Sequence, residues 1–310
     1  MQSVKVLHSI AELSDVPGPL VLAIGVFDGV HLGHRAVIER ALSDARAAGG
    51  STVVVTFDPH PARVLRPEQS PLLLTCTRHK QILIATLGVE HLLIIPFDDK
   101  LAAMEPDQFI HEISASANPL RQICVGENWA FGRRRAGNIK LLKTLGAGMG
   151  FEATGIPDVQ LDGRAVSSTV IRNAVQAGDI TTAAKLLGRH FSILGTVVEG
   201  RKMGRTIGFS TANLATNNEQ LPPDGVYAVA VQLRGRKLQG VANIGVRPTF
   251  ADAGARVCEV HLFDHSGDFY GEEIEVSFLR FIREERKFSS ADALREQIAM
   301  DVAAARQATS

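Results

Sequence analysis

The sequence is poor in the features that build a zinc site. Its 310 residues include three cysteines, Cys76, Cys124 and Cys258, and no two of them form a Cys-x-x-Cys pair. A structural zinc ion needs about four ligands at characteristic spacings, so these cysteines do not predict one. Unpaired cysteines are typical of a reducing compartment, and we expect each to be a small buried apolar residue.

No segment predicts secretion, a membrane span or a general attraction to nucleic acid. Residues 1–8 lack the basic start and apolar run of a signal peptide, and no window approaches the ~20 apolar residues that cross a bilayer. Lys plus Arg equals Asp plus Glu at 33 each, so no net charge draws the chain to an anionic polymer or surface. We therefore expect a cytoplasmic protein with neither a membrane nor a nucleic acid as partner; the oligomeric state is not predicted.

The pattern of apolar runs predicts two domains. With 45% hydrophobic residues, a chain of this length can form two cores. Apolar, β-branched runs separated by helix-length segments predict βαβ units around a parallel sheet in the first part; these runs are 20–26, 52–57, 91–97 and 122–126. Shorter runs after Gly188 predict a small antiparallel barrel; they are 191–198, 226–234, 238–245, 256–263 and 273–281. A last helix is expected from Ser289 or Ser290 to about Arg306, and the predicted domains are 1–187 and 188–310.

The motif GVFDGVHLGH, from Gly25 to His34, lies where the first apolar run gives way to a helix expected over about 34–48. Its glycines let the backbone approach a ligand closely, and His31 and His34 can donate hydrogen bonds to that ligand. The first turn of a helix also favours an anion. By itself the motif fits an ordinary turn, two metal ligands or a phosphate cradle. The scattered cysteines and the absence of a Gly-x-x-x-x-Gly-Lys-Ser/Thr loop favour the cradle.

Two other segments of the first domain could also hold phosphates. The run Arg133–Arg135 follows a predicted strand, although such a run is more often a solvated loop. The run Ser167–Thr169 begins a short amphipathic segment, and one of its hydroxyls is expected to cap that helix. The same hydroxyls, with Arg164 and Arg172, could equally bind a triphosphate.

Three motifs in order carry a resemblance to a known family. The segments Gly25–His34, Thr56–Pro61 and Val166–Arg172 together resemble the FMN adenylyltransferase module of the prokaryotic bifunctional riboflavin kinase/FAD synthetases. The resemblance implies a Rossmann-like nucleotidyltransferase domain that transfers AMP from ATP to FMN, giving FAD and pyrophosphate. It implies that His31 and His34 are donors to the phosphates. The implied binding residues are Gly25, Phe27, Asp28, Gly29, Gly33, Asn128, Arg164, Ser167, Ser168, Thr169 and Arg172.

The sequence departs from this family at three places, one of which is Ser210 in the second half, where the family usually has a proline. Asn128 and Trp129 stand where the family usually has an aspartate followed by an aromatic residue, and Val170 stands where an arginine is common.

The second half carries its own set of motifs. The segment Gly200–Asn213 has glycines every four residues and by itself suggests a flexible anion-binding loop. With Leu221–Tyr227, Gly240–Phe250 and Glu259–Leu262 it resembles the riboflavin kinase module of the same family. The resemblance implies a six-stranded barrel that transfers the γ-phosphoryl group of ATP to riboflavin. The implied ATP-binding and flavin-binding residues are Gly200, Gly204, Arg205, Gly208, Thr211 and Asn213.

The resemblance also assigns the chemistry of the kinase module. A ribityl alcohol needs a proton acceptor, and Glu259 matches the catalytic glutamate of the family. Thr211 and Asn213 supply hard oxygens that suit Mg²⁺. The residues alone leave other interpretations open: Glu259 fits a solvent-facing strand position, and Asn213 fits a turn.

The sequence therefore predicts a bifunctional enzyme that uses Mg²⁺ and ATP to convert riboflavin to FMN and then FMN to FAD. One alternative is a protein whose kinase alone is active. Another is a catalytically silent protein that binds flavin.

Overall fold

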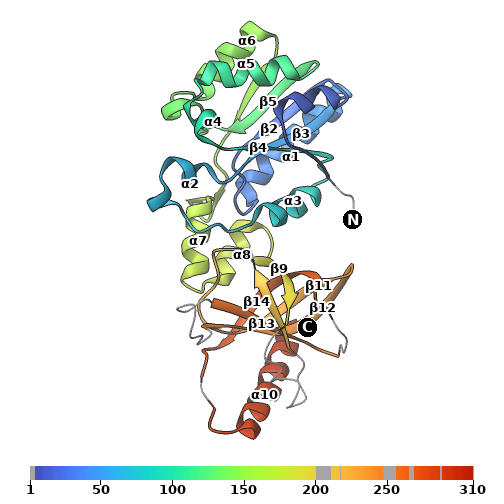
Figure 1. Ribbon diagram of the computed structural model, residues 1–310, viewed down its shortest axis with the longest axis vertical. Helices are drawn as coiled ribbons and strands as arrows, with labels where there is room; N and C mark the ends of the chain where they lie inside the picture. Colours follow the sequence, from blue (N-terminus) through green and yellow to red (C-terminus); the bar gives the residue numbers. More distant parts are fainter. Residues whose placement is uncertain are drawn as a thin grey trace. The chain divides into compact units, whose positions relative to one another are not determined.

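The computed structural model describes residues 4–199, 211–216, 218–246, 256–264, 269–286 and 288–309, which form two compact units (Figure 1). The first unit contains the residues up to Leu72 together with Thr77–Ser167. The second contains Leu73–Cys76 and the residues from Ser168 onward, so helices α7 (Ser168–Gln176) and α8 (Ile180–Leu187) group with it. The sequence predicts a domain boundary between residues 187 and 188, and this boundary stays a prediction.

The first unit is built on a parallel sheet of six strands in the order β1-β4-β3-β2-β5-β6. The strands are β1 (Lys5–Leu7), β2 (Leu20–Ile24), β3 (Ser51–Asp58), β4 (His91–Pro96), β5 (Leu120–Gly126) and β6 (Glu152–Ile156). Its helices are α1 (Leu32–Ala48), α2 (Pro61–Leu65), α3 (Thr77–Ala85), α4 (Asp99–Ala103), α5 (Pro106–Ser116) and α6 (Ile139–Met149). A small hairpin, β7 (Gln160–Leu161) and β8 (Arg164–Ala165), follows the sheet. The expected α/β class is confirmed.

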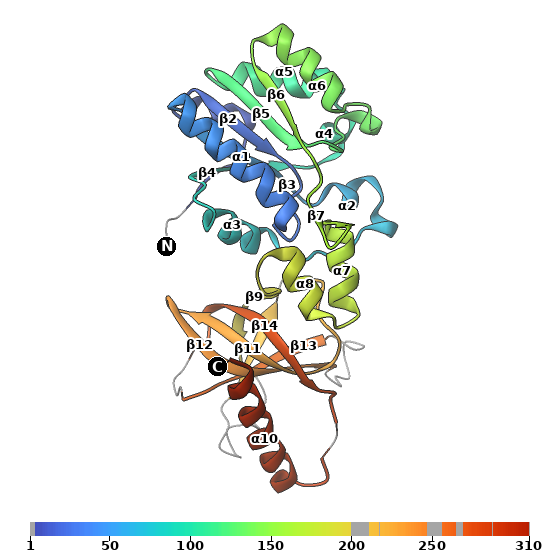
Figure 2. The same ribbon diagram turned by 180° about the vertical axis from the view of Figure 1, so that it is seen from behind.

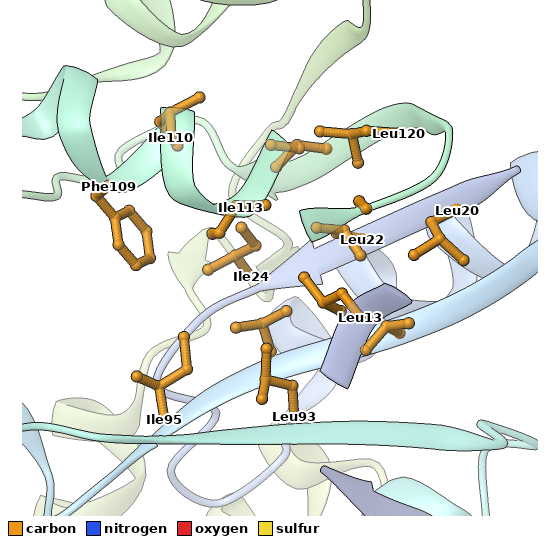
Figure 3. Close-up of a cluster of buried hydrophobic side chains, with 14 of the residues drawn as sticks. Leu13, Leu20, Leu22, Ile24, Leu93, Ile95, Phe109, Ile110, Ile113 and Leu120 are labelled. Carbon is orange, nitrogen blue, oxygen red and sulfur yellow. The ribbon is translucent and has the colours of Figure 1, made fainter. Parts of the chain in front are cut away.

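Helices cover both faces of this sheet, which explains the continuous apolar runs of its strands (Figure 2). Along β2, Leu20, Leu22 and Ile24 enter the core formed with α5 and α6, as Figure 3 shows for α5. The alternate residues Val21 and Ala23 enter the second core, formed with α1 and α3. With both faces covered, the edge at the carboxyl ends of the strands is where a ligand can bind.

The described residues of the second unit form a closed barrel with the strand order β10-β13-β12-β11-β14-β9. The strands are β9 (Ser192–Val198), β10 (Thr211–Thr216), β11 (Gly225–Leu233), β12 (Arg236–Val246), β13 (Arg256–Leu262) and β14 (Glu273–Arg283). All pairings are antiparallel, as predicted. Helix α10 (Ala291–Thr309) follows the barrel. The backbone N–H of Ala293 donates to Ser290 Oγ at 3.1 Å, consistent with a helix beginning at Ser290.

A buried ion pair fixes α10 to the barrel. Arg283, at the end of β14, donates from Nε to Asp301 Oδ1 at 2.9 Å and from its terminal nitrogen to Oδ2 at 2.7 Å. Gln297 also donates to Asp301 Oδ1, at 2.7 Å. Only 3% of Asp301 is exposed. A carboxylate so buried depends on these three donors for the solvation that water would give it.

We expect Asp301→Asn to destabilise the second unit by about 3 kcal/mol, because it leaves the Arg283 guanidinium without its buried counter-charge. The measurement is the urea midpoint of unfolding followed by circular dichroism. Asp292→Asn is the matched control on the same helix, since Asp292 and Arg295 are exposed and 3.9 Å apart; it should change stability by less than about 0.5 kcal/mol. Equal effects of the two substitutions would contradict the anchoring role of Asp301.

Four elements differ from the sequence prediction. Strand β10 occupies Thr211–Thr216, whose first residues were predicted within a flexible loop; Ala212 and Leu214 alternate into the barrel core, and this short period-two signal was hidden by the glycines before it. Helix α1 begins at Leu32 rather than near His34, because the His31 side chain caps it. The edge strands β1 and β6 were not predicted, and both are short.

Candidate active sites

The first candidate site lies in the turn between β2 and α1, where the histidine motif was found. His31 is the N-cap of α1, and its Nδ1 accepts a hydrogen bond from the backbone N–H of His34 at 3.3 Å. An Nδ1 that accepts carries no proton, so the proton of the neutral ring lies on Nε2. The capping role therefore makes His31 Nε2 a hydrogen-bond donor at the first turn of a helix.

The rings of this motif pack on one another. His31 and His34 are stacked, with their ring centroids 3.5 Å apart, and the edge of Phe27 meets His34 at 5.3 Å. A Cβ on Gly33 would lie 3.2 Å from His31 Cε1, and a Cβ on Gly25 would lie 2.9 Å from the Phe27 ring. The two glycines thus leave room for the rings of Phe27 and His31.

The backbone of this turn is strained. Phe27 and Val30 have positive φ angles of 53° and 40°, which side chains other than glycine rarely adopt, and Gly29 has a φ of 84°. Asp28, between them, is buried. Strain of this kind persists only where the surrounding structure holds it, and it is common at ligand sites.

A buried lysine, which the sequence analysis missed, holds the strained turn. Lys80 on α3 is 5% exposed, and its Nζ donates to the carbonyl of Val26 at 2.8 Å and to Thr56 Oγ1 at 3.3 Å. Thr56 Oγ1 also lies 3.0 Å from the same carbonyl. The signal in the sequence was a lysine placed one helical turn before the core residue Ile84. A charged group placed there needs a polar partner, and the turn supplies it.

Asn128 and Trp129, which depart from the family pattern, lie in the loop after β5. Asn128 Nδ2 donates to Asp158 Oδ2 at 2.7 Å, and the Trp129 ring stacks on Phe131 with centroids 4.3 Å apart. The carboxylate beside Asn128 is thus that of Asp158, which lies in the loop after β6 and not in the loop after β5. In the run Arg133–Arg135, Arg133 pairs with Glu105 at 3.1 Å.

The predicted phosphate-binding residues between Arg164 and Arg172 are divided between the two units, because the first unit ends at Ser167. Val166 O lies 3.5 Å from the position of a Cβ on Gly33, so the chain just before Ser167 reaches the first turn of α1. Arg164, on β8, is exposed. Ser168, Thr169 and Arg172 belong to α7 in the second unit, and their grouping with the histidines stays a prediction.

The second candidate site is a row of polar residues across three strands of the barrel. Asn213 on β10 is paired with Glu259 on β13, and Glu259 is paired with Asn243 on β12. Paired residues of antiparallel strands point to the same face. Along β13, Cys258 and Val260 are buried and point to the other face, while Glu259 is half-buried. The row therefore lies on the outer face of the barrel.

Thr211 lies two residues before Asn213 on β10, paired with His261. It shares a face with Asn213, so the hydroxyl and the amide predicted to hold a metal are on the same side of one strand. Their neighbour Glu259 was predicted as the base. Gly200, Gly204, Arg205 and Gly208, predicted in the preceding segment, lie outside the described residues.

The cysteines take no part in either site. All three are buried, as expected, and none is part of a disulfide. Burial raises the pKa of the Cys124 and Cys258 thiols to about 12, so both stay protonated near neutral pH. Among the residues that the structure describes, no group of three or more His, Cys, Asp and Glu side chains is arranged to hold a metal ion.

The chain matches known families along nearly its full length. The FAD synthetase family model matches residues 14–170, and the riboflavin kinase family model matches residues 187–309. Among curated proteins, a bifunctional riboflavin kinase/FMN adenylyltransferase of Pseudomonas fluorescens is 39% identical, covering 99% of this chain and 97% of that protein. The corresponding protein of Bacillus subtilis is 37% identical, covering 97% of this chain and 96% of that protein.

A solved structure resembles the chain as a whole. It is described as a macrolide-efflux protein from Streptococcus pneumoniae, is 31% identical, and covers 97% of this chain and 98% of its own with a TM-score of 0.82. In the described part of this chain, none of the helices has the length and apolar character that a membrane span requires.

Proposed function

The chain belongs to the bifunctional riboflavin kinase/FMN adenylyltransferase family, and we propose that its two activities take place at the two sites described above. It phosphorylates riboflavin to FMN and transfers the adenylyl group of ATP to FMN. This sets aside the alternatives of a kinase alone and of a silent flavin-binding protein. The cytoplasmic location stays a prediction.

Adenylyl transfer is assigned to the turn between β2 and α1. The FMN phosphate attacks the α-phosphorus of ATP, and pyrophosphate leaves, so the protein must align two anions and stabilise their charge. His31 Nε2 and His34 donate to the phosphates, and the N–H groups and dipole of α1 add to the attraction. The observation that carries this assignment is the hydrogen bond to His31 Nδ1, because it fixes the proton on Nε2.

Binding of the substrates is assigned to the residues around the turn. Gly25, Phe27, Asp28, Gly29 and Gly33 form the cradle. Asn128 contributes from the loop after β5. The phosphates are also bound by Arg164, Ser167, Ser168, Thr169 and Arg172.

Phosphorylation of riboflavin is assigned to the row on β10 and β13. Glu259 accepts the proton of the ribityl 5′-hydroxyl as that oxygen attacks the γ-phosphorus. A carboxylate on a strand, paired on both sides, is held in position for this step. Gly200, Gly204, Arg205 and Gly208, with Thr211 and Asn213, are assigned to binding the substrates.

Thr211 and Asn213 fit a Mg²⁺ ion. A hydroxyl and an amide carbonyl on one face of β10 are hard oxygen donors, and Mg²⁺ usually takes few protein ligands beside phosphate oxygens and water. When bound, the ion would offset the charge of the ATP phosphates. Asn213 is 5% exposed, so its amide is already withdrawn from bulk water.

The direct test is to incubate the protein with riboflavin, ATP and Mg²⁺ and to separate the flavins by chromatography. We expect FMN to appear first and FAD to follow, with neither product when Mg²⁺ is chelated. FMN without FAD would contradict the assignment of the first site, and product formation in the chelated sample would contradict the use of Mg²⁺.

Lys80→Met is expected to lower kcat/KM for FAD formation from FMN at least about tenfold. It removes the hydrogen bond from Nζ to the Val26 carbonyl and leaves only the one from Thr56 Oγ1; a bond from a charged donor is worth about 1.5–3 kcal/mol. FMN formation, on the barrel, should be unchanged. Lys140→Met, at an exposed position of α6, is the matched control and should leave both rates unchanged. Equal losses of the two activities in the Lys80 variant would show a general defect in folding instead.

A further inference from the structure

Asn243 completes the polar row of the barrel but was not predicted as a site residue. It lies on β12, directly opposite Glu259, so it flanks the proposed base on the side away from Asn213. All three side chains point to the same face of the barrel. Asn243 is thus a direct neighbour of the group that is assigned to accept the riboflavin proton.

The orientation of the Asn243 amide is set by Glu285, which follows β14. Asn243 Nδ2 donates to Glu285 Oε1 at 3.4 Å. A Cβ on Gly245 would lie 2.6 Å from that same oxygen, so the glycine makes room for the carboxylate. Because only the nitrogen end of an amide can donate to a carboxylate, the oxygen end must face the other way.

The amide oxygen of Asn243 is left with an unmet hydrogen-bond requirement. Oδ1 is shielded from solvent and accepts no hydrogen bond from any described group. A buried acceptor without a donor destabilises the structure, so such atoms usually mark the place of a missing partner. A hydrogen-bond donor or a cation can meet this requirement. Ionised phosphates cannot do so, because they only accept.

We propose that Asn243 Oδ1 accepts a hydrogen bond from a hydroxyl of the ribityl chain of riboflavin, which makes Asn243 a specificity-determining residue for flavins with a polyol side chain. The inference rests on the assignment of the kinase reaction to Glu259. The reacting 5′-hydroxyl must reach Glu259, and the other hydroxyls of the same chain are the nearest donors that the substrate brings to Asn243.

The test compares riboflavin with a flavin whose side chain is 5-hydroxypentyl, which keeps the reacting hydroxyl and lacks the others. Wild-type protein should prefer riboflavin by at least about tenfold in kcat/KM. Asn243→Ala should lose most of that preference through a higher KM for riboflavin, with the KM for ATP unchanged. Gln239→Ala, an exposed amide on the same strand, is the matched control and should keep the wild-type preference.

Circular dichroism shows whether each variant is folded, and formation of FAD from supplied FMN shows whether the first site is intact. Asn243→Ser, a smaller change in volume, is measured beside the alanine variant in case that variant does not fold. A wild-type protein that uses both flavins equally well would overturn the inference, as would an Asn243→Ala variant whose KM rises for ATP instead of riboflavin. A Glu259→Gln variant with the kinase activity of the wild type would instead refute the assignment of the kinase site. Failure of the inference on Asn243 is thus distinguishable from failure of the proposed site.

Discussion

A variant carrying His31→Asn and His34→Ala is expected to lose at least about 10³-fold in FAD formation while FMN accumulates from riboflavin and ATP. Removal of one donor to a developing oxyanion typically costs about 10²–10³ in rate, and this variant loses two. The kinase row is on different elements, β10 and β13, so it should be unaffected. The measurement is the time course of FMN and FAD, separated by chromatography.

The choice of asparagine at position 31 separates catalysis from helix stability. His31 caps α1, and alanine there would remove the cap at a cost of about 1 kcal/mol. Asparagine can still accept from the backbone N–H but has no ring nitrogen in the place of Nε2. A double variant that still makes FAD at the wild-type rate would contradict the assignment of the histidines.

Glu259→Gln is expected to reduce FMN formation by about 10²–10⁴, the range attributed to general acid–base catalysis. Glutamine has nearly the same shape as glutamate but cannot take a proton from an alcohol. FAD formation from supplied FMN should continue at the wild-type rate, because that reaction uses the turn before α1. Both half-reactions are measured separately, with riboflavin or with FMN as the starting flavin.

Glu296→Gln, an exposed position of α10, is the control for this substitution and should change neither half-reaction. If the Glu259→Gln variant remains an active kinase, Glu259 is a solvent-facing strand residue, which is the other interpretation that the sequence leaves open. A variant that loses both half-reactions while remaining folded would show that the two sites are not separate.

The local parts of the structure could be predicted from the sequence. The alternation of β-branched runs and helices predicts the parallel sheet because each strand buried on both faces must be apolar throughout, as β2 is. The histidine motif could be placed at the start of a helix because glycines and a following amphipathic pattern mark that junction. Both inferences use residues that are close together in the chain.

The parts that depend on distant residues could not be predicted. Lys80 is 54 residues from the Val26 carbonyl that it binds, and Asn243 is paired with Glu259 only because the barrel fixes the register of β12 and β13. Sequence periodicity can indicate that Lys80 is on a buried face, but it cannot identify its acceptor. Strand β10 was missed for a different reason: its two buried apolar residues, Ala212 and Leu214, are too few to outweigh the glycines before it.

The most direct test of two separate sites is a mixture of the two variants. Neither the His31→Asn/His34→Ala protein nor the Glu259→Gln protein should convert riboflavin to FAD by itself. In an equimolar mixture with riboflavin, ATP and Mg²⁺, the histidine variant makes FMN and the Glu259 variant adenylylates it, so FAD should form. A mixture that makes no FAD, while the Glu259 variant still adenylylates supplied FMN, would contradict this account.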